Sequence, residues 1–351
     1  MKTGITGLSF SGKTTLFCAL TGQDYDALGH GRDVHIGTVK VPDERLEKLF
    51  EMIKPKKITH ATMEFFDIAG QTGGGEKTIE PKSLQAIRNA ESLIVVLDGF
   101  SPGADPKRDF DTLIDEYIFN DLVVATNRLE RLEKEMRSGG RDELIREKAV
   151  LETCRDILEN GGILREHEFE DAEEKLLRGF QFITLKPLLV VINVAESDLG
   201  SGRARELENL FAGVKETACT AICCEIEMEI AMLDESDRAD FLVSMGITEP
   251  ALGKLIRMSY DSLGLLSFFT AGGPDEVRAW TVRKGSNAQE CAGAIHSDLA
   301  RGFIRAETVA YEDYVSAGTF KDARERGLLR VEGRDYIVKA VSYTHLRAHE
   351  T

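Results

Sequence analysis

Residues 7–15 read GLSFSGKTT, and Gly7, Gly12, Lys13 and Thr14 in this stretch have the spacing G-x-x-x-x-G-K-[ST]. In this pattern the backbone N–H groups point at a phosphate, the lysine reaches the β- and γ-phosphates, and the hydroxyl ligates Mg²⁺. The stretch follows the apolar GITGL and precedes TLFCALTG, the strand-then-helix setting that the motif requires. Because an ordinary glycine-rich turn does not need that setting, we predict a nucleoside triphosphate site. The loop residues predicted to bind the nucleotide are Gly7, Ser9, Phe10, Ser11, Gly12, Lys13, Thr14 and Thr15.

A second short pattern, DIAG, ends the apolar run MEFFDIAG. In P-loop nucleotide hydrolases an aspartate in this place holds the Mg²⁺ shell, and the N–H of the following glycine senses the γ-phosphate. We therefore predict Thr14 and Asp67 as the metal ligands and Gly70 as a contact of the γ-phosphate. The next residue, Gln71, stands where Ras-type enzymes keep a glutamine that orients water. Lys13 and Gln71 are the predicted catalytic residues.

A third pattern concerns the nucleotide base. In GTPases an N-K-x-D motif reads guanine, because its aspartate accepts hydrogen bonds from N1–H and the exocyclic amine. The corresponding place here reads NVAE, with Asn193, Val194 and Glu196. Val194 replaces the lysine and Glu196 moves the carboxylate by one methylene, which should reduce selectivity for guanine. We predict that these three residues bind the nucleotide and that the substrate is ATP, with GTP less favoured. Adenine N1 is an acceptor that a carboxylate cannot satisfy, so ATP must be read in another way.

The composition narrows the class of protein. The chain has 351 residues and a formal net charge of −16, and its length predicts two or three domains. This acidity argues against binding of nucleic acid over the whole surface, and we predict no DNA partner. No run of about 18 apolar residues and no leader-like N-terminus is present, so we expect a soluble, cytoplasmic protein without a membrane partner. The six cysteines form no C-x-x-C pair, which is typical of reduced thiols in that compartment.

The elements that must position these residues follow from the hydrophobic pattern. Short apolar runs bounded by turn residues predict a parallel sheet buried on both faces, and with the P-loop strand they predict a doubly wound α/β domain. These runs are MEFFDIAG (63–70), ESLIVVLDG (91–99), PLLVVINVAE (187–196) and TACTAICCEIE (217–227). Residues 121 to about 184 carry Leu and Ile at three- and four-residue spacing among dense charges, which predicts two antiparallel helices in a projecting arm. Past about residue 264, strand-like pieces around one short helix predict a small α+β module.

Together these features resemble the YchF-type, Obg-like ATPases of the TRAFAC class. The resemblance covers nearly all of residues 1–340 and is most specific from EVRAWT to GFIRAETVAYEDY. It implies a P-loop NTPase G domain that prefers ATP, an inserted helical coiled-coil arm, and a C-terminal α+β, ubiquitin-like TGS domain. It also implies Mg²⁺ dependence, association with the ribosome through the arm and the TGS domain, and a role in translation or stress regulation. The expected ranges are 1–120 and 185–263 for the G domain, 121–184 for the arm and 264–340 for the TGS domain.

Several residues depart from the family pattern. Phe10 stands where family P-loops usually carry an asparagine that is associated with potassium binding in related NTPases, and Gln71 stands where a hydrophobic residue is usual. The loop LDGFSPGADPKRD lacks the histidine that is thought to assist catalysis in the family. Thr38, the hydroxyl nearest to the usual switch I metal ligand, does not align with it. We predict that this chain positions its water with Gln71 and has no potassium requirement; the alternative is that Gln71 points to solvent in a mobile switch.

The last residues, VSYTHLRAHET (341–351), do not resemble the closing strand of the family. They resemble the translation of a transposase sequencing adapter, and we expect them to be an artefact of that kind. The TGS domain would then continue after GRDYIVKA in the natural protein, and this chain would be truncated, with one sheet edge unpaired.

Three functions fit these patterns. The first, which we favour, is a slow Mg²⁺-dependent ATPase that acts as a nucleotide switch. The second is a nucleotide-gated binding module with negligible turnover, in which ATP orders the switches so that the arm and the TGS domain meet a ribosomal partner. The third is an Obg-type GTPase.

Overall fold

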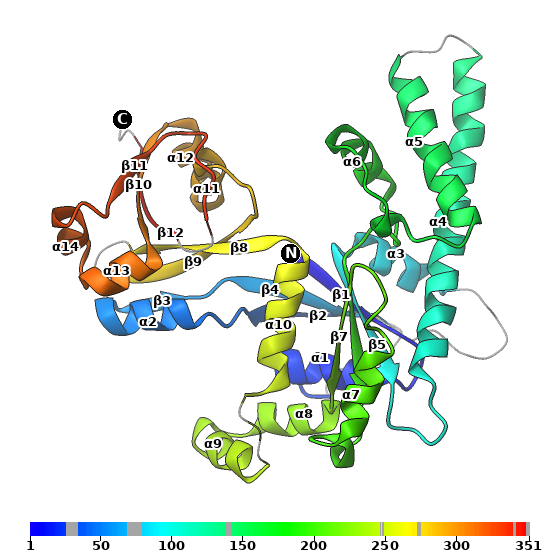
Figure 1. The fold of residues 1–351 in the computed structure, drawn as a ribbon, viewed down its shortest axis with the longest axis horizontal. Coiled ribbons are helices and arrows are strands. Elements are labelled where there is room, and N and C mark those ends of the chain that lie inside the picture. The colour runs from blue at the N-terminus through cyan, green and yellow to red at the C-terminus, as the bar shows by residue number, and fades with distance from the viewer. Residues whose placement is uncertain are drawn as a thin grey trace. The chain divides into compact units, whose positions relative to one another are not determined.

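A computed structural model describes residues 1–25, 34–68, 79–137, 142–245, 247, 249–271, 275–339 and 342–348, and Figure 1 labels their elements. The contacts divide the chain into two compact units. Unit 1 consists of Met1–Thr38 and Glu64–Leu255, and unit 2 consists of Val39–Met63 and Ile256–Thr351. Each unit is therefore made from two separate stretches of the chain.

Unit 1 is built on a six-stranded sheet in which five neighbouring strands are parallel. Its strands are β1 (Lys2–Thr6), β2 (His35–Lys40), β4 (Thr62–Asp67), β5 (Ser92–Asp98), β6 (Leu188–Asn193) and β7 (Thr217–Ile222), in the order β2-β4-β1-β5-β6-β7. The pairs β4–β1, β1–β5, β5–β6 and β6–β7 are parallel. Every residue of β6 is buried, as expected for a strand that is covered on both faces. Because the strands are parallel, the residues that follow β1, β5, β6 and β7 share one edge of the sheet.

The helices of unit 1 surround this sheet and extend beyond it. They are α1 (Lys13–Thr21), α3 (Pro81–Asn89), α4 (Pro106–Met136), α5 (Asp142–Glu159), α6 (Asp171–Leu177), α7 (Gly202–Asn209), α8 (Cys224–Met232) and α9 (Glu235–Ser244), with short 3₁₀ turns η2 (Leu164–Glu166), η3 (Arg178–Phe180) and η4 (Glu196–Asp198). A further helix, α10 (Ala251–Ser262), runs across the boundary between the units. One apolar core joins Val95 and Val190 of the sheet to Leu132 and Leu151 of α4 and α5. The sheet and these two long helices thus share a single core.

The expected helical arm is the pair α4 and α5, which lie side by side in Figure 1. Arg128 of α4 joins them, because its guanidinium donates to Glu147 at 2.7 and 3.0 Å. The first helix begins at Pro106, well before residue 121, where we expected it. Asp105 caps this start by accepting a backbone N–H hydrogen bond at 3.1 Å, and proline is favoured at the first helical position. In the part of the chain that the structure describes, no helix has the length and apolar character needed to span a membrane.

Unit 2 is an α+β module. Its elements are α2 (Glu44–Ile53), β3 (Lys57–Thr59), β8 (Leu265–Ala271), β9 (Glu276–Arg283), α11 (Ala288–Ile295), α12 (Ser297–Arg301), β10 (Phe303–Ala310), α13 (Tyr311–Ala317), α14 (Phe320–Glu325), β11 (Arg330–Glu332) and β12 (Ser342–Ala348). The sheet order is β11-β10-β12-β8-β9-β3. β8 and β9 are antiparallel, whereas β3 joins β9 in parallel and pairs Lys57 with Glu276. Residues 39–63, which lie within the range expected for the G domain, are therefore grouped with unit 2, although their two ends continue strands β2 and β4 of the first sheet. The domain ranges themselves stay predictions.

Strand β12 belongs to the segment that we expected to be an adapter artefact. In the structure it pairs along its length with β10 in antiparallel orientation and with β8 at Tyr343. The sheet position that was expected to be open is therefore filled by these residues. The pairing does not test where the segment comes from, and its artificial origin stays a prediction.

Candidate nucleotide-binding site

The phosphate loop joins β1 to α1, and its two motif glycines adopt conformations that other residues avoid. Gly7 has φ +146° and Gly12 has φ +95°. A Cβ atom at Gly7 would lie 2.3 Å from the carbonyl oxygen of Val96, and one at Gly12 would lie 2.2 Å from Asn193 Nδ2. Both positions therefore need glycine for the backbone angle and for the close approach of a neighbour.

Asn193, at the end of β6, holds this loop in place. Its Nδ2 donates to the carbonyl oxygen of Ser11 at 3.2 Å, and its Oδ1 accepts from the N–H of Cys224 at 3.1 Å. The side chain is buried and ties the phosphate loop to the first turn of α8. We predicted Asn193 as a nucleotide-binding residue, and its hydrogen bonds in the structure position the loop.

Lys13 is the first residue of α1 and is only 6% exposed. Its Nζ donates to the carbonyl oxygen of Leu8 at 2.6 Å, across the phosphate loop. Burial lowers the pKa of Lys13 to about 8, and the charge of Asp67 partly opposes this shift. A bound polyanion would favour the charged form of this lysine, because an opposite charge nearby raises an ammonium pKa. The lysine is thus placed to interact with phosphate oxygens.

Thr14 and Asp67, the two predicted metal ligands, are in direct contact. Thr14 Oγ1 donates to Asp67 Oδ2 at 2.8 Å, while Asp67 Oδ1 is buried without a hydrogen-bond partner among the described residues. Burial raises the pKa of Asp67, and the hydrogen bond from Thr14 and the charges of Lys13 and His35 oppose this.

These residues fit Mg²⁺, which prefers hard oxygen ligands and is commonly held by one or two carboxylates together with phosphate oxygens and water. The free Asp67 Oδ1 supplies one such ligand. Among the described residues, no three His, Cys, Asp or Glu side chains gather as a metal cage. The fit is therefore to a cation that arrives with a phosphate ligand and keeps part of its water shell.

A cavity of about 850 Å³ opens beside the phosphate loop, a volume in the usual range for small-molecule sites. The predicted residues that line it are Ser9, Phe10, Gly12, Lys13, Thr14, Thr15, Asn193, Val194 and Glu196. The sequence patterns did not identify the other lining residues, which are Tyr25, Phe100, Ala195, Cys223, Glu225 and Met228. Phe100, Ala195 and Cys223 come just after β5, β6 and β7, so the rule that ligands bind at the carboxyl ends of parallel strands could have found them.

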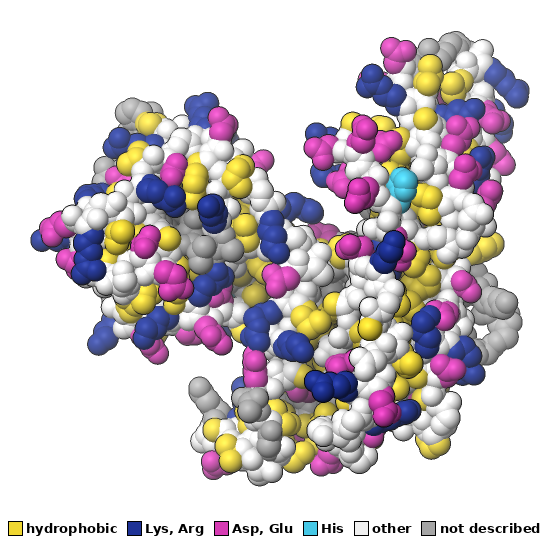
Figure 2. Space-filling view, viewed as in Figure 1, with side chains coloured by type: hydrophobic (Ala, Val, Ile, Leu, Met, Phe, Trp, Pro, Cys, Tyr) yellow, Lys and Arg dark blue, Asp and Glu magenta, His cyan; other side chains and the backbone are white. Residues whose placement is uncertain are grey.

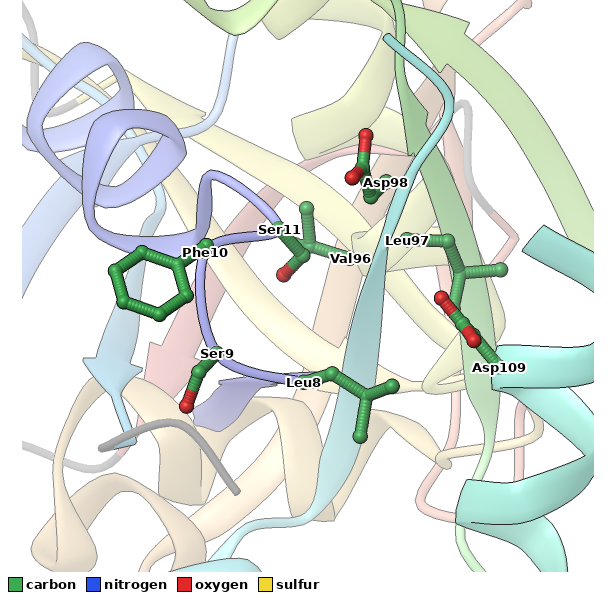
Figure 3. A pocket seen from close by; sticks show the side chains of 8 residues that line it. All are labelled: Leu8, Ser9, Phe10, Ser11, Val96, Leu97, Asp98 and Asp109. Atoms are coloured by element: carbon green, nitrogen blue, oxygen red, sulfur yellow. The ribbon is translucent and has the colours of Figure 1, made fainter. Parts of the chain in front are cut away.

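A second cavity, of about 410 Å³, lies against the same loop and is shown in Figure 3. Its walls come from the loop, from β5 and from Asp109 in the first turn of α4. Ser11 lines it, with an Oγ that is buried without a hydrogen-bond partner in the described chain. Phe10 has a backbone φ of +66° and is 93% exposed. Its ring projects from the loop on the side away from Val96 and Leu97 (Figure 3). Helix α4 thus reaches the surroundings of the phosphate loop.

Two predicted residues, Gly70 and Gln71, lie outside the described residues. Their predicted roles at the γ-phosphate and the attacking water stay predictions. Asp67 and the described residues of the loop are close together, which is the arrangement that the motif spacing predicted.

Comparison with known proteins decides the family. Residues 265–348 match the family model YchF-GTPase_C, described as a protein of unknown function (DUF933). The chain is 37% identical over 364 residues to the ribosome-binding ATPase YchF of Bacillus subtilis, and the match covers 99% of each sequence. The chain belongs to the YchF family. A YchF relative of the same name from Escherichia coli O157:H7 is 36% identical over 96% of each sequence.

The structural comparison agrees with this YchF assignment. The solved structure titled "Structure of the Schizosaccharomyces pombe YchF GTPase" matches with a TM-score of 0.86 and 26% identity, over 99% of this chain and 97% of that one. The predicted family and the predicted α/β fold, with a G domain and a C-terminal domain, are confirmed. The names of these YchF relatives differ in one respect, because the bacterial ones are called ATPases and the yeast one is called a GTPase.

Proposed function

We propose that this chain is a Mg²⁺-dependent ATPase that acts as a slow nucleotide switch. The observation that carries the proposal is the meeting of Lys13, Thr14 and Asp67 at a glycine-rich loop beside a cavity of about 850 Å³. One buried ammonium group, a hydroxyl and a carboxylate with one oxygen that no described residue bonds lie where the phosphates of a nucleotide would enter. Hydrolysis of ATP by the purified protein, measured with and without Mg²⁺, tests the proposal directly.

Each residue has a separate part in this mechanism. The N–H groups of the loop and the ammonium group of Lys13 would stabilise the charge that develops on the phosphate oxygens during transfer. Thr14 and Asp67 would hold Mg²⁺, which when bound neutralises charge on the β- and γ-phosphates. Asn193 keeps the loop against α8, so that these donors are already oriented before the nucleotide binds.

The base end of the cavity supports ATP over GTP. Val194 is 1% exposed and offers the base no charged side chain, where the N-K-x-D motif of GTPases has a lysine. Glu196 is one methylene longer than the aspartate of that motif. We expect ATP to bind at least about tenfold more tightly than GTP, a difference of about 1.4 kcal/mol. Glu196→Asp leaves the core untouched and should reduce the ratio of ATP affinity to GTP affinity. The double variant with Val194→Lys should reduce this ratio further. Competition titrations with both nucleotides measure these ratios.

Glu225→Asp is the matched control for this experiment, because Glu225 lines the same cavity and the change again removes one methylene. It should leave the ratio unchanged. Equal affinities for ATP and GTP in the unaltered protein, or a preference for GTP, would support the Obg-type GTPase instead, in agreement with the name of the yeast relative.

A role for Gln71 in positioning water is also part of the proposal. Gln71→Leu should lower the rate of hydrolysis by about one to two decades while nucleotide affinity is retained. Potassium should not activate the enzyme over sodium, since Phe10 stands in the place of the asparagine associated with that ion. Gln85→Leu is the control, because Gln85 is an exposed residue of α3 whose amide N–H donates to Asn89 Oδ1 at 3.0 Å. An unchanged rate in Gln71→Leu, or strong potassium activation, argues against this role.

We further propose that the chain associates with the ribosome through the α4–α5 hairpin and unit 2. The support is the name of the bacterial relatives, ribosome-binding ATPase. Co-sedimentation with ribosomes at several nucleotide states tests the association. Single-turnover hydrolysis with and without ribosomes separates the ATPase switch from a binding module that holds ATP with negligible turnover.

A further inference from the structure

Three side chains near the middle of α4 contact three different segments of unit 1. They are Glu116, Tyr117 and Asp121, which lie within six successive residues of the helix. Their partners are the end of β1, the chain just before α3, and the chain leading to β6. The first of these segments directly precedes the phosphate loop, and the third leads through β6 to Asn193.

Tyr117 contacts the strand that leads into the phosphate loop. Its hydroxyl lies 3.2 Å from Thr6 Oγ1, and the two side chains are 1% and 2% exposed. Thr6 is the last residue of β1, directly before Gly7. Because both hydroxyls are buried, removing one leaves the other less well satisfied, and the position of this strand end depends on α4.

Glu116 contacts the chain just before α3. Its carboxylate accepts a hydrogen bond from the N–H of Ile79, which stands two residues before Pro81. The second oxygen, Oε1, is buried without a partner among the described residues. The same helix therefore holds the chain at Ile79, just before α3.

Asp121 contacts the chain that leads to β6. Its carboxylate is fully buried and accepts from the N–H groups of Ile183 at 2.9 Å and Thr184 at 2.7 Å, and from the Thr184 hydroxyl at 2.8 Å. β6 then runs to Asn193, which holds the phosphate loop. One carboxylate of α4 thus anchors the beginning of the strand whose end supports the site.

The helix that makes these contacts is also half of the hairpin. α4 is continuous for 31 residues, which corresponds to roughly 46 Å of helix. Its buried stripe continues from Tyr117 through Ala125 and Leu129 to the contact with α5. The helix has no break between Tyr117 and its contact with α5. A shift of residues 116–121 is therefore carried into the hairpin.

We propose that Thr6, Glu116, Tyr117 and Asp121 are positioning residues that link occupancy of the phosphate loop to the motion of the α4–α5 hairpin. This rests on the proposed binding of ATP. A triphosphate that restrains the phosphate loop restrains β1 and β6 with it, and both strands are hydrogen-bonded, directly or through the preceding chain, to α4. By linkage, the same contacts make nucleotide affinity depend on the state of the hairpin.

The test is amide hydrogen exchange of the full chain with and without magnesium and the β,γ-imido analogue of ATP, whose binding is first measured by calorimetry. In the unaltered protein the analogue should slow exchange in residues 122–136 and 142–159 by about threefold or more, a protection of the kind that local rigidification produces. Tyr117→Phe and Thr6→Val should each reduce this nucleotide-induced change to less than half and weaken binding by about three- to tenfold.

Thr112→Val is the matched control for Thr6→Val. Thr112 lies on α4 as well, but its hydroxyl is exposed and donates to the helix carbonyl of Arg108. It should keep the full nucleotide-induced change. Melting temperatures of all variants separate a general loss of stability from a loss of the link, because only the link alters the difference between the free and bound states.

Two results would overturn the proposal. One is binding of the analogue to the unaltered protein without any change of exchange in the hairpin, which would leave the proposed function intact. The other is Tyr117→Phe and Thr6→Val proteins that retain the whole nucleotide-induced change. If the unaltered protein does not bind the analogue at all, the proposed function fails and this inference fails with it.

Discussion

Replacing Lys13 by alanine is expected to weaken the binding of ATP by about a hundredfold or more. The reason is that the loop N–H groups cannot replace a cation placed against the β- and γ-phosphates, and losing one partner of a buried charge pair costs about 2 to 5 kcal/mol. The fold should be retained, because within the described residues Nζ donates to one carbonyl oxygen, that of Leu8. Calorimetric titration with ATP and Mg²⁺ measures the loss.

Lys186→Ala is a close control. Lys186 is half-buried, its pKa is also lowered to about 8 by burial, and its Nζ also donates to backbone carbonyls, those of Arg88 and Ala90. It stands before the amino end of β6, away from the phosphate loop. This variant should lose stability and keep its affinity for ATP. A folded Lys13→Ala protein with unchanged affinity would mean that the loop is only structural.

Replacing Asp67 by asparagine is expected to lower the rate of hydrolysis by about two decades or more and to raise the Mg²⁺ concentration needed for half-maximal activity. The change keeps the shape of the side chain and removes the charge that would hold the cation. The expected loss of rate is of the size seen when a charge in the transition state loses the group that stabilises it. It also removes the charge that raises the pKa of Lys13. A titration of hydrolysis with Mg²⁺ at fixed ATP measures both changes.

Asp98→Asn makes the same chemical change at the end of the neighbouring strand β5. Asp98 Oδ1 accepts from the N–H groups of Phe100 and Ser101, both at 3.0 Å, and an amide oxygen can also accept such bonds. Its Mg²⁺ titration should match that of the unaltered protein. If Asp67→Asn also keeps the unaltered titration, Asp67 is not a metal ligand.

The phosphate site was predictable because its determinants are local. The conformations of Gly7 and Gly12 and the contact of Thr14 with Asp67 follow from motif spacing at the ends of two neighbouring strands. The burial of β6 also follows from its apolar run. A local pattern cannot show which side chains from other strands approach the loop, and the clamp that Asn193 makes on Ser11 was therefore missed.

The start of α4 was misplaced for a different reason. Residues 105–120 begin with the cap signal Asp105-Pro106, but dense charges make the apolar stripe that begins at Phe110 hard to recognise. That stripe becomes clear only when the sheet and α5 are known to cover it. The contacts of Tyr117 and Asp121 lie in or next to this missed portion, so the link between the hairpin and the site was not visible in the sequence.

The pairing of β3 with β9 has a consequence for how the protein is made. Thr59 and Glu276 are 217 residues apart, and a chain that grows by about 5 to 20 residues per second takes roughly 10 to 40 s to span that distance. During this time the nascent segment Val39–Met63 lacks the strand it pairs with and the apolar surface that later buries Leu46 and Leu49. The period in which this protein is most exposed to aggregation and proteolysis therefore falls during its own translation, after the first strands have formed and before residue 276 has left the ribosome.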